Sequence, residues 1–407
     1  GLYATGSANT FVGSQAGEGG TTSAPYSSGA NNTFLGYQAG KGFTTGGQNV
    51  AIGSNSSYAL TTGQYNITVG SGAGFALTTG TTNVIIGQDA GVALTDTSNT
   101  VLIGGFAGDA INSTDANGTV AIGYQAGSAI TDGAGNTAIG YQALTTVTTG
   151  DMNTAIGDGA LKLVTGQYNV AVGYRALDSA DGGESNNIGI GTNVMGHINH
   201  DDSDHNVAIG DSALLGGTGT VKRNIAIGSN ALGTGISNNN QTGTVAIGYN
   251  ALYALSSGAG NTAIGYEALL TETTGTGNTV IGYQAAKVQS GASYNTIIGR
   301  EAFLAADGTE SSNVAIGQSS MGGANNNSIT SNVAVGRNSM VGGTGVLDRN
   351  VAIGYFAMDG TGAINAQQNI FIGDNAGGGT WTTAASNSNV AIGATAMSDA
   401  LNGALGN

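Results

Sequence analysis

A short motif that returns at a nearly constant interval along the whole chain most strongly limits what this sequence can fold into. The motif is the pentapeptide Asn-(Val/Thr/Ile)-x-(Ile/Val/Leu)-Gly, and 22 copies fill the 407 residues. The interval between successive closing glycines is most often 17, as from Gly36 to Gly53, and stays between 16 and 20, except for a first interval of 23 that contains Pro25. Such a period is too short for a helix pair or a propeller blade and is typical of one coil of a β-solenoid.

The sequence therefore predicts an all-β fold, a single-chain parallel β-solenoid (a β-roll) of about 22 coils of 16–20 residues. Residues 1–407 are expected to form one continuous repeat solenoid, with a loop insertion rich in His and Asp at 192–206 and an end segment at 394–407. Representative copies of the motif, predicted to be structural, are Asn136, Ile139 and Gly140; Asn206, Ile209 and Gly210; and Asn261, Ile264 and Gly265.

Side chains alternate along a strand, so the residues three and one before each glycine share a face, and the residue between them points the other way. The two flanking positions are β-branched with few exceptions, and the middle one is most often Ala, as in Val207, Ala208 and Ile209. We expect Val and Ile to fill the inside of each coil. Ala would then form a small, flat outward surface that another chain can approach closely.

The Asn that opens the motif is present in 19 of the 22 copies and is replaced by Thr100, Thr119 and Thr244 in the others. Asn tolerates left-handed backbone and bonds to its own turn, so we expect it to start each strand and to stack on the Asn one coil away. The closing Gly is expected at the opposite corner, where a positive φ or a close chain approach would exclude a Cβ.

A second pattern, x-x-Ala-(Leu/Gly/Met), follows each glycine, as in Tyr141-Gln142-Ala143-Leu144. We expect a second, shorter strand there, with its Ala packed against the Val/Ile row. The remaining Thr, Gly, Ser and Asn residues vary in number and mark a loop edge.

Composition excludes several classes of function. The formal net charge is −15, from 9 Lys+Arg and 24 Asp+Glu, whereas a nucleic-acid partner would require the opposite sign. The chain has no Cys and no apolar run of about 18 residues, so we expect no membrane insertion by this segment. A coil this short encloses a thin core, so the solenoid is expected to associate with copies of itself around a common axis.

The run at 136–144, with near copies at 261–269 and 278–286, resembles the repeat of phage tail-fibre shafts. It is also similar to the Asn-Ser-Val-Ala-Ile-Gly repeat in the heads of trimeric autotransporter adhesins, although the repeat here is a few residues longer. The resemblance covers the whole chain. It implies a left-handed parallel β-roll with three chains to a fibre, a homotrimeric rod that binds a host cell or surface.

All three histidines of the chain lie with several Asp residues in one stretch, which includes His197, His200, Asp202 and His205. Histidine and carboxylate are usual ligands for divalent metals, so a divalent cation could bind here, alone or across a trimer axis. The alternative is a solvated loop between two coils.

Tyrosine often follows the closing glycine, as at Tyr124, Tyr141, Tyr266 and Tyr283. Such a row of rings could stack on the sugars of a host glycan, or the rings could pack on one another as a ladder. Trp381 is a further candidate for a receptor contact in this aromatic-poor chain.

Carboxylates in the turns have no His or Lys partner of the kind that a glycoside hydrolase or another acid–base enzyme would need, so we predict no enzymatic activity. The favoured hypothesis is a structural, extracellular fibre or adhesion module, on a virion tail fibre or a cell surface, whose partners are its own copies and a cell-surface glycan or protein. An alternative is a self-assembling extracellular filament or sheath subunit. An ice-binding solenoid ranks below both, because the outward strand position is mainly Ala.

Overall fold

The computed structural model describes residues 2–20, 26–179, 182–217, 219–233, 241–304, 310–323, 328–342, 345–359, 365–379 and 385–398. The chain divides into two compact units, unit 1 (Gly1–Asp204) and unit 2 (His205–Asn407). Each unit is a parallel β-solenoid with almost no helix, as the sequence predicts for the fold class. That the solenoid runs on unbroken from one unit to the other stays a prediction.

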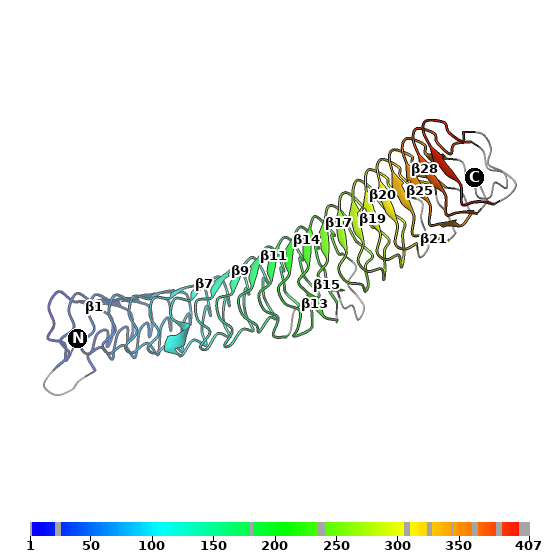
Figure 1. The fold of residues 1–407 in the computed structure, drawn as a ribbon. Helices are drawn as coiled ribbons and strands as arrows, with labels where there is room; N and C mark the ends of the chain where they lie inside the picture. The colour runs from blue at the N-terminus through cyan, green and yellow to red at the C-terminus, as the bar shows by residue number, and fades with distance from the viewer. Residues whose placement is uncertain are drawn as a thin grey trace. The chain divides into compact units, whose positions relative to one another are not determined.

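Unit 1 contains eleven three-residue strands among its described residues, and each precedes one of the repeat's closing glycines (Figure 1). They are β1 (Thr10–Val12), β2 (Thr33–Leu35), β3 (Val50–Ile52), β4 (Ile67–Val69), β5 (Val84–Ile86), β6 (Val101–Ile103), β7 (Val120–Ile122), β8 (Thr137–Ile139), β9 (Thr154–Ile156), β10 (Val170–Val172) and β11 (Ile188–Ile190). One 3-10 helix, η1 (Thr114–Ala116), lies in the turn before β7.

Unit 2 likewise has eleven main strands in its described part. They are β12 (Val207–Ile209), β14 (Ile225–Ile227), β16 (Val245–Ile247), β17 (Thr262–Ile264), β18 (Thr279–Ile281), β19 (Thr296–Ile298), β20 (Val314–Ile316), β22 (Val333–Val335), β25 (Val351–Ile353), β28 (Ile370–Ile372) and β30 (Val390–Ile392). Two-residue strands accompany them: β13 (Val221–Lys222), β15 (Gln241–Thr242), β21 (Ile329–Thr330), β23 (Met340–Val341), β24 (Leu347–Asp348), β26 (Met358–Asp359), β27 (Ala366–Gln367) and β29 (Ser386–Asn387).

Within each unit, every main strand pairs in parallel with the strand of the next repeat, residue on equivalent residue. In β3 and β4, for example, Ala51 lies opposite Thr68, and the flanking β-branched residues lie opposite each other. The same register joins β16 to β17 in unit 2. Each repeat is therefore one coil, and equivalent positions of successive repeats stack into columns.

The predicted orientation of the strand side chains is wrong. In every main strand except β1 the middle residue is buried, including Ala208 in β12, whereas Val207 is half-buried and Ile209 is 38% exposed. Ile139 and Ile264, which were expected inside, are also only half-buried and lie on the outer face. Alanine therefore faces the interior of the coil, and the β-branched rows face outward.

The coil interior is too narrow for two large side chains from each strand, because the turn after the strand also fills it. In the coil of β8, the buried apolar side chains are those of Ala138, Ala143, Leu144 and Val147. In some coils a large strand residue is matched by glycine in the turn: a Cβ on Gly40 would lie 2.5 Å from the ring of Phe34. The coil of β19 differs, because Ile297 and Phe303 are both fully buried there.

The second short strand predicted after each glycine is generally absent from the described residues, because that segment forms tight turns. In the coil of β8, the Ala143 N–H donates to the Gly140 carbonyl at 3.4 Å, and Gln142 and Leu144 have left-handed φ values of 50° and 56°. Short strands begin at the last residue of this pattern at Met340 and Met358, in β23 and β26. The turn Ala is buried as expected, but it shares the interior with the strand Ala and does not pack on the Val/Ile row.

The predicted Asn ladder is confirmed. Asn66 is buried, its N–H donates to Asn49 Oδ1 at 2.9 Å, and its Nδ2 donates to the Gly80 carbonyl at 2.9 Å. Its own Oδ1 accepts the N–H of Asn83 at 3.1 Å, and similar bonds run through much of both units, with the Asn206–Asn224 pair among them. The left-handed residue, however, is the one before the Asn, as at Tyr65 with φ 59°.

The ladder is interrupted between β6 and β7. Thr100 keeps the bonds to the coil before it, with N–H and Oγ1 both donating to Asn83 Oδ1. Thr119, in contrast, directs its N–H and its Oγ1 to the nearby Ala116 carbonyl, at 3.3 and 2.8 Å. The junction between these two coils therefore relies on strand pairing without the side-chain bond.

The closing glycine has the role that the sequence predicts. Gly140 has a φ of +142°, and a Cβ there would lie 2.6 Å from the carbonyl carbon of Gly157 in the next coil. Gly210 and Gly265 repeat this geometry in unit 2. Any side chain at this corner would force the coils apart, since Cβ atoms are not found that close to backbone.

Candidate association surface and predicted binding residues

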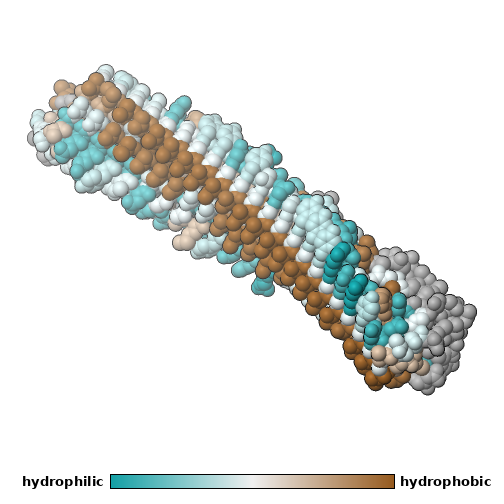
Figure 2. All heavy atoms as spheres, turned by 90° about the horizontal axis from the view of Figure 1, so that it is seen from above, coloured by the Kyte–Doolittle hydropathy of each residue, from teal (hydrophilic) through white to brown (hydrophobic). Residues whose placement is uncertain are grey.

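The most extensive candidate site is an apolar stripe on the outer face of each unit's main sheet. The apolar stripe is defined here as the first and third residues of the eleven main strands of a unit, which are Val, Ile, Thr or Leu throughout. Figure 2 shows the apolar residues of this face gathered in a brown band. Ile67, Ile156 and Ile190 of unit 1 are 42, 38 and 40% exposed. In unit 2, Ile209 and Ile353 are each 38% exposed.

Two physical arguments make this surface a candidate interface. Parallel sheets occur almost always with both faces buried, but here the described residues cover only the inner one. Contiguous apolar patches larger than a few hundred Å² are rare on monomers and mark interaction surfaces. The outward surface is therefore this stripe and not the alanine surface predicted from the sequence. The alternation of residues along each strand separates the two faces of the sheet, but it does not show which of them faces outward.

The predicted tyrosine residues form ladders. Tyr124 and Tyr141 stack with ring centroids 5.7 Å apart, and Tyr266 stacks on Tyr249 and Tyr283, at 5.3 Å in each case. These rings are about half exposed, but their faces contact neighbouring rings, which favours the ladder over sugar stacking within the row. Glycan binding along these rows stays a prediction. Trp381 lies outside the described residues.

The ladder of unit 2 is flanked by a closed ion pair. Glu267 accepts from Lys287 Nζ at 2.7 Å and from Gln284 Nε2 at 2.8 Å. The hydrogen bond from Lys287 lowers the pKa of Glu267, and the charge of Glu267 raises the pKa of Tyr266. The hydrogen-bonding capacity of this carboxylate is thus used within the protein.

The segment 192–206 is part of a coil rather than a free loop. Val194, Met195 and Ile198 are fully buried, so its first half completes the interior. Asn206 already belongs to the ladder of unit 2, where its Nδ2 donates to the Val221 carbonyl at 2.7 Å. The end segment 394–407 is described only up to residue 398, where it forms a turn.

One predicted metal ligand, His200, and the neighbouring Asp204 accept backbone hydrogen bonds within the turns. His200 Nδ1 accepts the N–H of Asp202 at 3.2 Å, and Asp204 Oδ1 accepts the Ser185 N–H at 2.8 Å. His205 belongs to unit 2 and fills the left-handed position before Asn206. Across the described residues, no three His, Cys, Asp or Glu side chains gather in a way that could hold a metal ion. A metal site at His197, His200, Asp202 and His205 stays a prediction.

One buried acid that sequence reasoning missed lies beside this segment. Glu184 is fully buried, and its carboxylate accepts the N–H groups of His200 and Gly182 at 3.1 and 3.2 Å. Burial raises the pKa of Glu184 above its ordinary value, and these bonds partly oppose that effect. In other coils, such as those of β4 and β5, the equivalent position, three residues before the ladder Asn, is glycine. The repeat pattern therefore does not predict a buried acid at this position.

The only helix of the described residues is η1, and no helix there has the length and apolar character needed to cross a bilayer. Neither the known protein-family models nor the curated proteins include one that matches this chain.

Proposed function

We propose that this chain is a structural, non-enzymatic module of an extracellular fibre, the shaft of a viral tail fibre or the head of a bacterial adhesin. In this proposal it associates as a homotrimer through its apolar stripe and presents its remaining surface to a cell-surface glycan or protein. The observation that carries the proposal is the outward orientation of the β-branched rows on a parallel sheet.

The stripe supports association because burying it removes apolar side chains from water at little polar cost. Burial of apolar surface contributes roughly 25 cal/mol per Å², and the stripe contains no charged residue that would have to be desolvated. Since each chain has the same stripe along each unit, several copies can turn it toward a common axis. The number three, the left-handed coil and the location outside the cell come from the repeat's resemblance to fibre proteins.

Solution mass tests the proposal. Light scattering after size exclusion is expected to give three times the chain mass of 39.7 kDa. The triple variant Ile67→Lys, Ile156→Lys, Ile190→Lys is expected to be monomeric with an unchanged circular dichroism spectrum, because lysines in the stripe would be buried without partners on association.

The matched control is Leu163→Lys, since Leu163 is 39% exposed, close to the 38% of Ile156, but lies outside the stripe. It should remain trimeric. A wild-type chain that stays monomeric at all concentrations, or a triple variant that keeps the wild-type mass, would contradict the proposal.

Polymers that grow with concentration would instead favour the alternative, a self-assembling filament or sheath subunit. Ice binding remains a lower-ranked hypothesis. Most of the outward strand positions are Val or Ile, not the predicted Ala, and Thr, which an ice-binding array would need, is a minority among them.

A further inference from the structure

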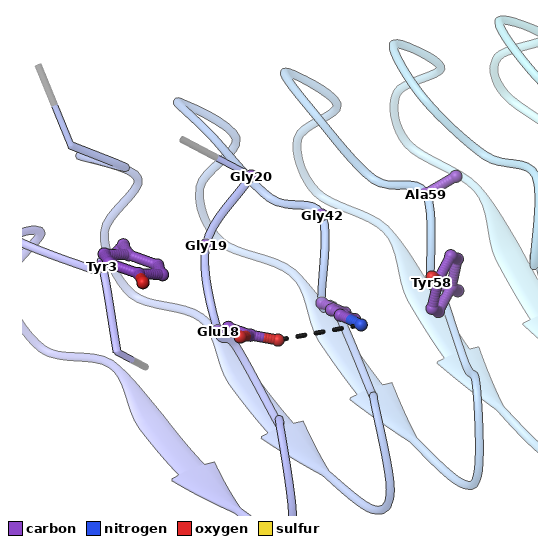
Figure 3. A pocket seen from close by; sticks show the side chains of 8 residues that line it. Tyr3, Glu18, Gly19, Gly20, Gly42, Tyr58 and Ala59 are labelled. Atoms are coloured by element: carbon purple, nitrogen blue, oxygen red, sulfur yellow. Dashed lines mark ion pairs between the residues drawn. The ribbon is translucent and has the colours of Figure 1, made fainter. Parts of the chain in front are cut away.

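A small pocket lies at the N-terminal end of unit 1, away from the apolar stripe. Its cavity volume is about 310 Å³, at the lower end of the range of about 300–1,000 Å³ for small-molecule sites. Four large side chains line it, those of Tyr3, Glu18, Lys41 and Tyr58 (Figure 3). Glu18, Lys41 and Tyr58 each lie five residues after a closing glycine, so they come from successive coils at the same position.

The acid and the base of this pocket form a loose ion pair without a hydrogen bond. Glu18 Oε2 and Lys41 Nζ are 3.8 Å apart, which exceeds the distance of a hydrogen bond. Glu18 Oε2 itself is buried and has no hydrogen-bond partner among the described residues, whereas the Glu18 and Lys41 side chains as a whole are about a quarter exposed. The Glu267–Lys287 pair of unit 2, at 2.7 Å, shows the closed arrangement that this pair does not adopt.

Lys41 Nζ also lies over the ring of Tyr58, 5.7 Å from its centroid. A loose ion pair whose two side chains remain partly exposed suits a ligand group that can both donate and accept. A hydroxyl has this property, and two hydroxyls on neighbouring carbons can bond to a carboxylate and to an ammonium at once. The opposite charges of Glu18 and Lys41 cancel, while the chain carries a net charge of −15 that repels anions. Neutral polyols fit these groups better than acidic ligands do.

Aromatic rings stand on both sides of the pair in Figure 3, Tyr3 on one side and Tyr58 on the other. Each is supported by another ring: Tyr3 stacks on Tyr26 with centroids 6.2 Å apart, and Tyr58 stacks on Phe75 at 4.9 Å. Aromatic side chains contact the C–H faces of sugar rings as apolar surface while adjacent polar groups bond the hydroxyls.

Glycine keeps the floor of the pocket open. A side chain at Gly20 would clash with the carbonyl of Gly42, and one at Gly19, whose φ is +99°, would lie 2.8 Å from Ser27 Oγ. Backbone therefore forms the floor, and a ligand ring can approach it closely.

We propose that this pocket binds a neutral pyranose, as a free sugar or as a residue of a glycan. The proposal deepens the attachment role proposed above and rests on it, but the two are tested separately.

The test uses the full chain and saturation-transfer NMR with the methyl glycosides of glucose, galactose, mannose and N-acetylglucosamine, and with that of N-acetylneuraminic acid as the acidic comparison. At least one neutral glycoside is expected to bind. Lys41→Met and Tyr3→Ala are each expected to weaken that binding at least about tenfold. Lys287→Met removes the equivalent base from the closed pair of unit 2 and should leave binding unchanged.

The proposal is overturned if no neutral glycoside binds, if the acidic one binds better, or if neither Lys41→Met nor Tyr3→Ala weakens binding. Thermal melting of each variant confirms that it remains folded. A further variant, Tyr58→Phe, keeps the aromatic ring and is expected to retain binding. The mass in solution is measured on the same samples. A trimer without sugar binding overturns the pocket alone, whereas sugar binding by a monomer overturns the association.

Discussion

At the scale of single residues, one interior position of unit 2 carries Leu255, Glu272 and Gln289 in successive coils, all of them buried. The Glu272 carboxylate accepts four backbone N–H bonds of 2.6–3.1 Å, from Thr274, Gly275, Gly291 and Ala292. Neither Oε1 nor Nε2 of Gln289 has a hydrogen-bond partner among the described residues. The same position therefore holds a fully bonded polar group in one coil and an unsatisfied one in the next.

Replacing each of these two side chains by Leu, the residue found one coil earlier, should have opposite effects on stability. Gln289→Leu is expected to stabilise the protein by about 1–3 kcal/mol, because it removes a buried amide without partners. Glu272→Leu is expected to destabilise it by more than about 3 kcal/mol, because it leaves four N–H groups, two of them buried, without an acceptor. Calorimetric melting temperatures check both, and a shift of both variants in the same direction would contradict this explanation.

At the scale of the structural element, the strand and its ladder Asn act together, since the Asn joins each coil to both of its neighbours. Asn66→Ala is expected to lower the free energy of unfolding by about 2–4 kcal/mol, because its neighbours lose buried hydrogen bonds. Asn66→Thr should cost less, since Thr100 already keeps the bond to the preceding coil. Thermal melting provides the measurement.

Gln64→Ala is the control for the ladder variants, because Gln64 lies two residues away and is exposed. It is expected to change stability by less than about 0.5 kcal/mol. If Asn66→Ala were no more destabilising than this control, the ladder would contribute nothing to the junctions.

The sequence predicted the coil, its corner glycine and its ladder, because each depends on a residue type with few substitutes. It did not predict which strand face is buried, since alternation separates Ala208 from Val207 and Ile209 without orienting them. The usual preference for burying the larger residue led to the wrong choice. A signal was present in the pairing of Phe34 with Gly40 and of Phe371 with Gly377, where a large strand residue is matched by glycine in the turn.

The pocket of unit 1 was equally hidden in the sequence, for a different reason. Glu18, Lys41 and Tyr58 come from three successive coils and belong to no shared motif. Only the stacking of coils places them side by side, and only coordinates show that the acid and base are 3.8 Å apart. The residues of the apolar stripe, in contrast, recur at fixed positions of the repeat, so the sequence predicts that they form a row, although not which face of the sheet carries it.

At the scale of a whole unit, stability should follow the number of coils, because each coil contacts mainly its neighbours. Deleting residues 137–153 removes one complete coil and joins Asn136 to Thr154, which restores the motif. This variant is expected to fold and to melt within a few degrees of the wild type. Deleting 141–149 removes about half as much chain but leaves a coil too short to close, and it should lower the melting temperature further. A larger loss from the complete-coil deletion would contradict a modular solenoid.

The interrupted ladder between β6 and β7 has a mechanical consequence. In a fibre under tension, coils of a unit carry the load in series, so every junction bears the same force and the one with the fewest bonds yields first. The junction between β6 and β7 lacks the ladder bond, because Thr119 turns its donors to Ala116, and it is therefore one weak point within unit 1. Extension that starts there would leave intact coils on both sides of the break.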